Sequence, residues 1–588
     1  MAAQGRKDVA GLSAEELDIA LNRPLTTPAN CVLLECLRDR LHLRTKRCAT
    51  ERFRCQKRDR GMRADSPRAI CTRMLCGLGI LTALSAPALD DETTGVAAAS
   101  DSVLQEITIT AQRLQLLGTA QSASEGVVAD EELQLLPAYR PGQLLETVPG
   151  LIVTSHSGEG KANQYLMRGY NLDHGTDLET WVDGMPINEP THAHGQGYTD
   201  LNFMIPELAD RLTYTKGPYY ADVGDFGAAG SIHVDYRDLI ANQAQLTTGT
   251  YGFQRLFTAG TQALADGHLL EAVEVQHYDG PFDTPDDQRK ENAVLRYSAG
   301  DERDGYSLSA MVYHDIWNNT TDIPLRALTE GLVPNRFGSL DSSDGGRAWR
   351  SSLSFNEHAI VGEGQLTSSV FFIDNQLHMW NDFTHYLIDP VHGDQEEQYE
   401  NRRTFGGRTD FTVPAPLGDI RNQVSIGMLV REDILHVGRG STEDRVMLPV
   451  EDSPPSYTND DMVYLFATAA YLQAITHWTS RLRSVIGARE DYQHGTDDDY
   501  LAALHQTAGY TNGGTVHEGL IQPKGSLIYA LSDSAELYLS AGRGFHSADI
   551  RGVNQDGHAD LGLPNTPLLA KQEGQELGVR AEAGAHSR

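Results

Sequence analysis

Short segments in which apolar and polar side chains alternate recur from residue 237 to the end of the chain, and they restrict the possible folds more than any other feature. In residues 423–431, for example, apolar side chains stand at every second position: Val424, Ile426, Met428 and Val430. A period of two predicts β-strands with one apolar and one polar face. An all-β sandwich would alternate in the same way, but here short turns (265–267, 532–534) alternate with long polar connections (320–346, 441–460). That asymmetry favours a transmembrane β-barrel, with lipid outside and water or another domain inside.

A different texture precedes these segments, in residues 144–234. Short β-like runs at 150–153, 165–168 and 180–182 are separated by turns rich in glycine and proline. Glycine suits positions where φ is positive or where another backbone approaches closely. The pattern predicts a compact, strand-rich domain that is enclosed by something else.

Four motifs of this stretch occur in an order typical of a known family. They are LLETVPGLIV from Leu144, YLMRGYN from Tyr165, VDGMPIN from Val182 and YTKGPYYADVGDFGAAGSIHV from Tyr214. Together they resemble the plug domain of TonB-dependent outer-membrane receptors. The resemblance implies a mainly β protein in which a 22-stranded transmembrane barrel holds an α+β plug domain in its lumen.

The barrel that the resemblance implies is expected to be partial. Between residues 241 and 588 we count roughly fourteen candidate strands, and the chain ends at Arg588 without the terminal aromatic residue that family members usually carry. An incomplete barrel has two unpaired edges, whose backbone groups lipid cannot satisfy. We therefore expect a plug domain over residues 116–236, a partial barrel over 237–588, and no functional pore from the chain as written.

The amino-terminal region predicts export. Residues 62–88 contain three arginines, an apolar run at 75–84 and Ala-Pro-Ala at 86–88, which together are typical of a signal peptide. Residues 1–61 are then an unusual extension or the result of a start codon placed too early. All six cysteines lie within the first 76 residues, at spacings that do not fit a zinc site. No stretch of about 20 apolar residues occurs, so a cytoplasmic-membrane protein is not expected.

Residues 89–115 form an acidic leader that contains an alternating hexapeptide. The hexapeptide resembles the TonB box of the family and consists of Glu106, Ile107, Thr108, Ile109, Thr110 and Ala111. A free segment with high β-propensity is able to add as a strand to the sheet edge of a partner. By resemblance the partner is the TonB energy-coupling protein on the periplasmic side; otherwise the hexapeptide is simply the first strand of the plug.

The candidate ligand site is the His-Ala-His segment of the plug and its neighbours. On an extended segment His192 and His194 would point to the same face, where two imidazoles are able to share one metal ion. The predicted ligand-binding residues on the outer face of the plug are His192, His194, Gln196, Tyr198, His174 and Glu189. Alternatively, these histidines form hydrogen bonds with backbone groups or with carboxylates of the barrel wall. Tyr165, Arg168 and Tyr170 are expected to pack rather than to bind ligand.

Charge and motifs exclude other functions. The formal net charge of −33 argues against nucleic-acid binding. The chain lacks the sequence motifs of serine hydrolases, nucleotide-binding proteins and zinc proteases, so an enzyme is not expected, and neither is a cofactor.

By resemblance the chain is a receptor in the cell outer membrane, in contact with its lipid, for the uptake of a small-molecule ligand. A ferric siderophore or other metal chelate is the first candidate, and zinc or copper bound by the plug histidines is the second; cobalamin and oligosaccharides are further candidates. A non-transporting surface-binding protein and a secreted metalloenzyme are alternatives of other classes.

Overall fold

A computed structural model describes residues 116–136, 139–155, 158–318, 322–449, 458–508, 513–554 and 566–582. The chain divides into two compact units, Met1–Gly95 and Val96–Arg588, and all described residues belong to the second. The predicted signal peptide, the hexapeptide at 106–111 and all six cysteines lie outside the described residues. Among the helices of the described part, none is long and apolar enough to cross a membrane.

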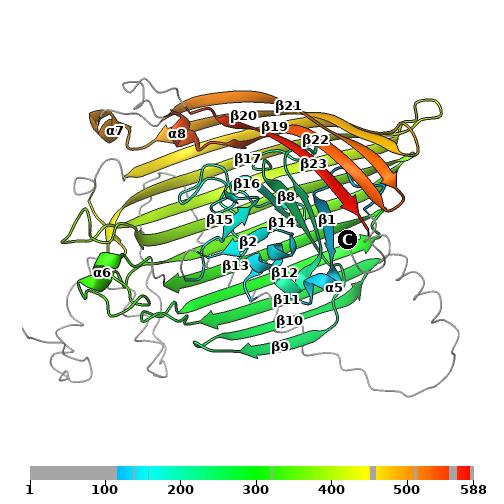
Figure 1. Cartoon of the computed structure of the whole chain (residues 1–588). Helices are drawn as coiled ribbons and strands as arrows, with labels where there is room; N and C mark the ends of the chain where they lie inside the picture. The colour runs from blue at the N-terminus through cyan, green and yellow to red at the C-terminus, as the bar shows by residue number, and fades with distance from the viewer. Residues whose placement is uncertain are drawn as a thin grey trace, which may run out of the picture. The chain divides into compact units, whose positions relative to one another are not determined.

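One large antiparallel sheet forms a wall that curls around the other elements (Figure 1). Its path runs from β23 to β9 through fourteen strands, and the short strand β18 (Val446–Met447) pairs with β17. The fourteen strands are β9 (Gln243–Thr248), β10 (Gln254–Leu264), β11 (Gly267–Tyr278), β12 (Gln288–Gly300), β13 (Gly305–Asn318), β14 (Gly345–Val361), β15 (Gly364–Asp382), β16 (Gln395–Pro414), β17 (Arg421–Glu443), β19 (Asn459–His477), β20 (Leu482–Asp499), β21 (Gly514–Ser532), β22 (Ala535–Ser547) and β23 (Leu569–Ala581). Sequential strands pair throughout, and within the described residues β9 and β23 each have one neighbour. The predicted barrel-type sheet of roughly fourteen strands is confirmed.

The connections of this wall differ at its two ends. At one end the links are short, as at 265–266, 362–363 and 533–534. At the other end they are long, and they carry the helices α6 (Leu325–Thr329), α7 (Ala502–Ala508) and α8 (Ile550–Asn554). All three helices lie on the left side of Figure 1. The wall therefore has the loop asymmetry that the sequence predicted.

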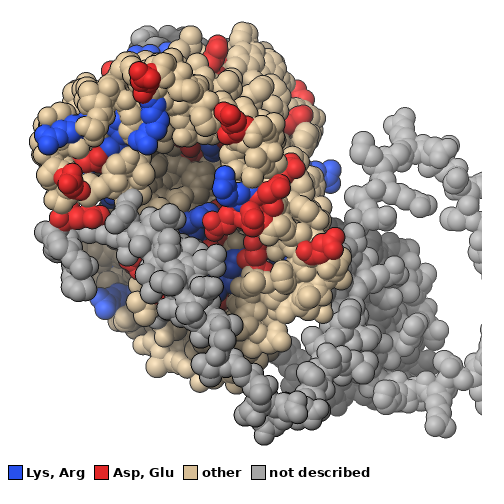
Figure 2. Space-filling model, turned by 90° about the vertical axis from the view of Figure 1, so that its right-hand side faces the viewer, with Lys and Arg blue, Asp and Glu red and all other residues tan. Residues whose placement is uncertain are grey.

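The two faces of each wall strand have opposite character. On β17 the side chains of Ile426 and Met428 are exposed on the outer face, whereas Asp433 is buried on the inner face. On β13, Leu308 is exposed between the buried Ser307 and Ser309. Figure 2 looks at the short-turn end, where acidic and basic side chains gather around a central hollow and at the rim. Apolar side chains thus face outward and polar ones inward, as a wall between lipid and an aqueous lumen requires.

The plug, residues 116–236, lies inside the wall and contains two small sheets. The five-stranded sheet has the order β1-β7-β8-β5-β6, with β5 and β8 parallel, and the three-stranded sheet has the order β2-β3-β4. The strands are β1 (Glu125–Ala129), β2 (Leu151–Thr154), β3 (Gln164–Met167), β4 (Tyr170–Asn171), β5 (Leu178–Val182), β6 (Met185–Pro186), β7 (Ala209–Lys216) and β8 (Gly230–Tyr236), and the helices are α5 (Asp130–Leu133), η3 (Pro141–Thr147) and η4 (Pro206–Leu208). The expected α+β plug is confirmed, and the runs predicted at 150–153, 165–168 and 180–182 match β2, β3 and β5 within one or two residues.

Local chemistry explains one tight turn of the plug. Asp183 and Gly184 join β5 to β6, and both have positive φ, at 48° and 76°. Such two-residue hairpins favour Asp-Gly because both central positions are left-handed. A Cβ on Gly184 would also meet the side chain of Asn356 on β14. The turn therefore needs glycine both for its own backbone and for the fit against the wall.

Candidate functional site

The segment 188–198 of the plug reaches the end of the wall that has long connections. The side-chain amide of Gln196 donates to the carbonyl of Ser547, the last residue of β22, and the N–H of Ile550 in α8 donates to Thr191 Oγ1 at 3.0 Å. His194 contacts Gln398, near the start of β16. All three wall residues adjoin long connections. In an outer-membrane barrel this end would face the outside of the cell.

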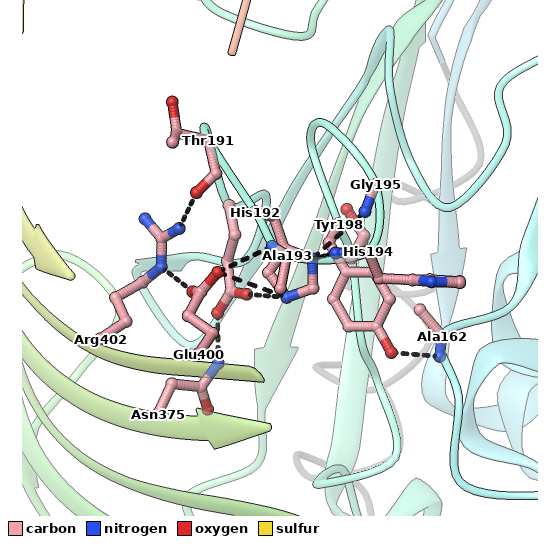
Figure 3. A network of polar contacts seen from close by, with 12 residues as sticks. Ala162, Thr191, His192, Ala193, His194, Gly195, Tyr198, Asn375, Glu400 and Arg402 are labelled. Carbon is pink, nitrogen blue, oxygen red and sulfur yellow. Dashed lines mark hydrogen bonds and ion pairs between the residues drawn. The ribbon is translucent and has the colours of Figure 1, made fainter. Parts of the chain in front are cut away.

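Backbone hydrogen bonds close the segment into a loop. Glu189 and Tyr198 form an isolated β-bridge, in which the N–H of Glu189 donates to the carbonyl of Tyr198 at 3.1 Å, and the N–H of Gly197 donates to the carbonyl of Glu189 at 3.0 Å. The buried Asn188 supports the base of this loop, since its side-chain amide donates to Gly175 O and Leu178 O. At the other side, Tyr198 Oη accepts a hydrogen bond from the N–H of Ala162 at 2.9 Å (Figure 3). Predicted ligand residue Tyr198 is thus a buried scaffold residue.

His192 lies inside the loop with both ring nitrogens in use. Its Nδ1 accepts hydrogen bonds from the backbone N–H groups of His194 (3.1 Å) and Gly195 (3.3 Å). The neutral ring therefore carries its proton on Nε2, which faces Glu189 Oε2 at 3.3 Å. Figure 3 shows the same nitrogen beside Glu400, whose Oε2 is 3.8 Å away. Burial lowers the pKa of His192 and raises the pKa of Glu189 to about 7. The ring also stacks on Tyr198, with centroids 4.1 Å apart.

Glu189, His192 and Glu400 are close enough to hold a metal ion, but their oxygens already have donors. The N–H of Ala193 donates to Glu400 Oε2 at 3.1 Å, and Arg402 Nε donates to Glu400 Oε1 at 2.6 Å. Glu189 accepts from the amide of Asn375. A metal ion bonds to the lone pair of a ring nitrogen. In this arrangement His192 Nε2 carries the proton and therefore has no lone pair for a metal ion. The group is a satisfied hydrogen-bond network that ties the loop to the wall.

His194 turns away from His192 and faces His174. The two Nε2 atoms are 3.0 Å apart, and the ring centroids are separated by 4.6 Å. His194 Nδ1 lies 2.7 Å from Gln398 Oε1, and His174 Nδ1 lies 3.0 Å from the carbonyl of Ala162. The structure therefore brings together His174 and His194, both predicted as ligand residues, but not the pair His192 and His194 that the sequence spacing suggested.

The remaining predicted residues have clear positions. Tyr165 is buried, and its hydroxyl donates to the carbonyl of Thr199 at 3.1 Å. Arg168 forms an ion pair with Glu576 on β23, and Tyr170 is exposed. Gln196 donates a hydrogen bond to the last residue of β22, as described above.

Sequence reasoning missed the wall residues of the site. They are Asn375, Gln398, Glu400 and Arg402. Nothing local marks Gln398, which is 204 positions from His194 in the chain. A weak signal existed for the buried arginines, because Arg-x-Asp recurs at 408–410, 431–433 and 489–491, on β16, β17 and β20. Residues two apart lie on the same strand face, so this pattern predicts inward ion pairs.

Family models match both parts of the structure. The plug corresponds to the TonB-dependent Receptor Plug Domain over residues 118–231. The wall corresponds to the model "TonB dependent receptor-like, beta-barrel" over residues 241–581, which is more than half of the chain. The chain belongs to the TonB-dependent receptors. Both matches agree with the order of the elements in the fold.

Individual relatives of this receptor are distant. It is 30% identical over 129 residues to the vitamin B12 transporter BtuB of Vibrio vulnificus strain YJ016, a match that spans 22% of this chain and 20% of that transporter. Among solved structures, the ferric citrate transporter FecA in its unliganded form has a TM-score of 0.62 at 16% identity, covering 80% of this chain and 70% of FecA. The copper transporter OprC has a TM-score of 0.56 at 18% identity, covering 79% and 70%. At these identities the structural likenesses show the fold.

Proposed function

We propose that this receptor resides in the cell outer membrane and imports a small metal chelate, with a ferric siderophore as the first candidate, at the expense of energy delivered by TonB. The observation that carries the proposal is the match of both plug and barrel models to one receptor family, with a histidine-rich plug loop at the long-connection end. The outward apolar face of the wall supports contact with lipid. The family consists of transporters, which supports a receptor rather than an enzyme.

The proposal assigns a role to each part of the chain. Residues 62–88 direct export, the leader 89–115 presents the box at Glu106–Ala111 to TonB, the plug 116–236 closes the lumen, and residues 237–588 form the wall. In this proposal, ligand binding at the loop 188–198 changes the availability of the box to TonB. That change is a coupling between two sites through one domain with two states.

A second candidate cargo is a zinc or copper ion with few ligands of its own. It is favoured by the convergence of His174 Nε2 and His194 Nε2 at 3.0 Å. A surface-binding protein without transport is the alternative of another class, and it would need neither the box nor proton-motive force.

Replacement of Ile109 by proline tests the energised step. Proline lacks the N–H that strand addition to a partner requires, so uptake is expected to stop while surface binding stays. Uptake of radiolabelled ⁵⁵Fe-siderophore and ⁶⁵Zn²⁺ is measured in cells that express the receptor containing this chain, with and without a protonophore. The matched control is Ser100→Pro, which places proline in the same leader outside the box.

Two outcomes separate the alternatives. Uptake that persists in the Ile109→Pro variant at the Ser100→Pro level contradicts the box assignment. Binding without any uptake in the unmodified receptor, whatever the state of the proton-motive force, contradicts transport and favours the surface-binding protein.

A further inference from the structure

We propose that the Nε2 atoms of His174 and His194 form a binding site for a late transition-metal cation such as Zn²⁺ or Cu²⁺. This inference rests on the proposed uptake function for its purpose but not for its chemistry. It concerns direct ligation by the protein, whereas a siderophore encloses its own metal ion.

The tautomers of both rings are set by their outer contacts. The carbonyl of Ala162 is only an acceptor, so His174 Nδ1 carries the proton of that ring. Gln398 Nε2 donates to Glu396 Oε1 at 2.9 Å, which orients its Oε1 toward His194 Nδ1 and places the proton there as well. In the neutral rings both lone pairs are therefore on Nε2, on the nitrogens that face each other.

Two facing lone pairs at 3.0 Å attract a cation. Without one the two lone pairs repel each other. Histidines that bind metals typically donate the other ring N–H to a carbonyl or carboxylate oxygen, as the backbone carbonyl and the amide oxygen are arranged here. The pair thus has the supporting contacts of a metal site, whereas His192 accepts backbone N–H groups on its second nitrogen and does not.

The separation of the nitrogens suits these ions. Zn–N bonds of about 2.0–2.1 Å at a tetrahedral angle place two nitrogens about 3.3–3.4 Å apart, and neighbouring ligands of a square-planar Cu²⁺ at similar bond lengths are about 2.9 Å apart. The observed distance of 3.0 Å lies between these two values. Small ring rotations that move the nitrogens by a few tenths of an ångström would therefore fit either ion. Imidazole nitrogen is a preferred ligand for both metals.

The surroundings of His174 and His194 suit a site that binds cargo rather than a closed structural metal site. Two protein ligands leave at least two coordination positions for water or for a chelating molecule. His194 is only partly buried, and the exposed ring of Phe383, in the connection after β15, stacks near it at 6.2 Å. The ammonium of Lys161 lies close enough to lower the pKa of His194. A metal ion that carries an anionic chelator would meet both the imidazoles and this ammonium group.

Metal titration of the purified receptor in detergent tests the proposal without TonB. A second group, His277, Asp279 and Asp287, is able to bind metal nearer the surface, so every variant carries His277→Ala. Zn²⁺ affinity is measured by calorimetry, and bound Cu²⁺ is examined by electron paramagnetic resonance. His174→Gln and His194→Gln retain a polar side chain, and thermal unfolding without metal checks that each variant is folded.

We expect one Zn²⁺ per receptor in the His277→Ala background, with coupling of Cu²⁺ to two imidazole nitrogens. Each of the two glutamine variants is expected to weaken Zn²⁺ binding by more than about 100-fold, and Gln398→Leu, which removes only the acceptor for His194 Nδ1, by about 10- to 100-fold. His233→Gln, a plug histidine stacked on Trp181, is the matched control and leaves binding unchanged.

The proposal is overturned by absence of Zn²⁺ binding, by unchanged affinity in His194→Gln, or by a site lost in His192→Gln but kept in His174→Gln. These results are independent of the uptake test. Metal binding without TonB-dependent uptake would contradict the proposed function alone, and siderophore uptake by a receptor that binds no Zn²⁺ would contradict this inference alone.

Discussion

At the scale of single residues, side chains of the wall hold the plug through the backbone carbonyls of the plug. Arg402 Nη2 donates to the carbonyls of Pro190 (2.9 Å) and Thr191 (2.6 Å), while Nε and Nη1 of the same guanidinium donate to Glu400 and Asp433. The same arrangement recurs where wall cations donate to other plug carbonyls: Arg431 to Asn188, Arg489 to Asp222, Arg483 to Ala120, Lys524 to Val223, Arg551 to His192 and Arg580 to Ala123. Several of the arginines also pair with carboxylates of the wall itself, and at these contacts the plug contributes neutral acceptors.

Replacement of Arg402 by methionine measures one of these anchors. The variant leaves Glu400 and Asp433 with less compensation in a buried setting, where loss of one partner costs about 3–5 kcal/mol of unfolding free energy. The neighbouring Arg403 points to the other face, its side chain is 71% exposed, and it pairs with Asp374. Arg403→Met is therefore expected to cost at most about 1 kcal/mol. Urea unfolding of the folded receptor in detergent compares the two, and equal midpoints would contradict the anchoring role of Arg402.

At the scale of elements, the plug segment before β3 fits against β13 through a glycine. Gly160 has φ of +84°, and a Cβ at this position would overlap the indole of the fully buried Trp317 on β13. Gly150 has nearly the same backbone, with φ of +80°, but open space around it. The two positions share the left-handed strain and differ only in the contact with the wall.

The matched variants Gly160→Ala and Gly150→Ala separate these two costs. Left-handed strain destabilises each by about 1–2 kcal/mol, and overpacking against Trp317 adds about 1–3 kcal/mol in Gly160→Ala. The difference between the urea midpoints reports the fit of plug to wall. Similar shifts in the two variants would show that the indole moves aside at little cost.

Local patterns predicted the strands but not the site. The alternation at 423–431 correctly indicates which residues of β17 face outward. The turn at 183–184 has Asp-Gly because both of its residues adopt a positive φ. By contrast, the spacing of His192 and His194 predicted a shared face because it assumed an extended segment. The structure instead closes a loop through the Glu189–Tyr198 bridge and directs each ring to a different partner. Partners such as Gln398 depend on how the wall surrounds the plug, and no local pattern encodes that.

At the scale of the whole molecule, apolar packing, hydrogen bonds to plug carbonyls and ion pairs join the plug to the wall. One hydrophobic cluster joins plug residues such as Tyr198 and Met167 to Trp317, Phe371 and Ile373 of the wall. Many of the polar anchors end on plug carbonyls, which water is able to satisfy once the lumen opens. Other contacts join opposite charges across the same boundary: Arg168–Glu576, Glu207–Arg255, Asp183–Arg296 and Asp222–Arg408. The movement of the plug that the proposed import requires would therefore separate these ion pairs as well as expose neutral groups to water.

A disulfide between plug and wall tests whether that movement is required. An ideal Cβ at Gly544 on β22 would lie 3.5 Å from Cβ of Ala228, within the 3.5–4.5 Å of disulfides, although it also approaches Pro218. All native cysteines lie in the first 76 residues, so the introduced pair would be the only one in the described plug and wall. In the double variant Ala228→Cys/Gly544→Cys we expect the oxidised receptor to bind cargo without importing it and the reduced receptor to import. The single variants control for the crowding at Pro218. Import at equal rates before and after reduction would mean that cargo passes while this part of the plug stays fixed to β22.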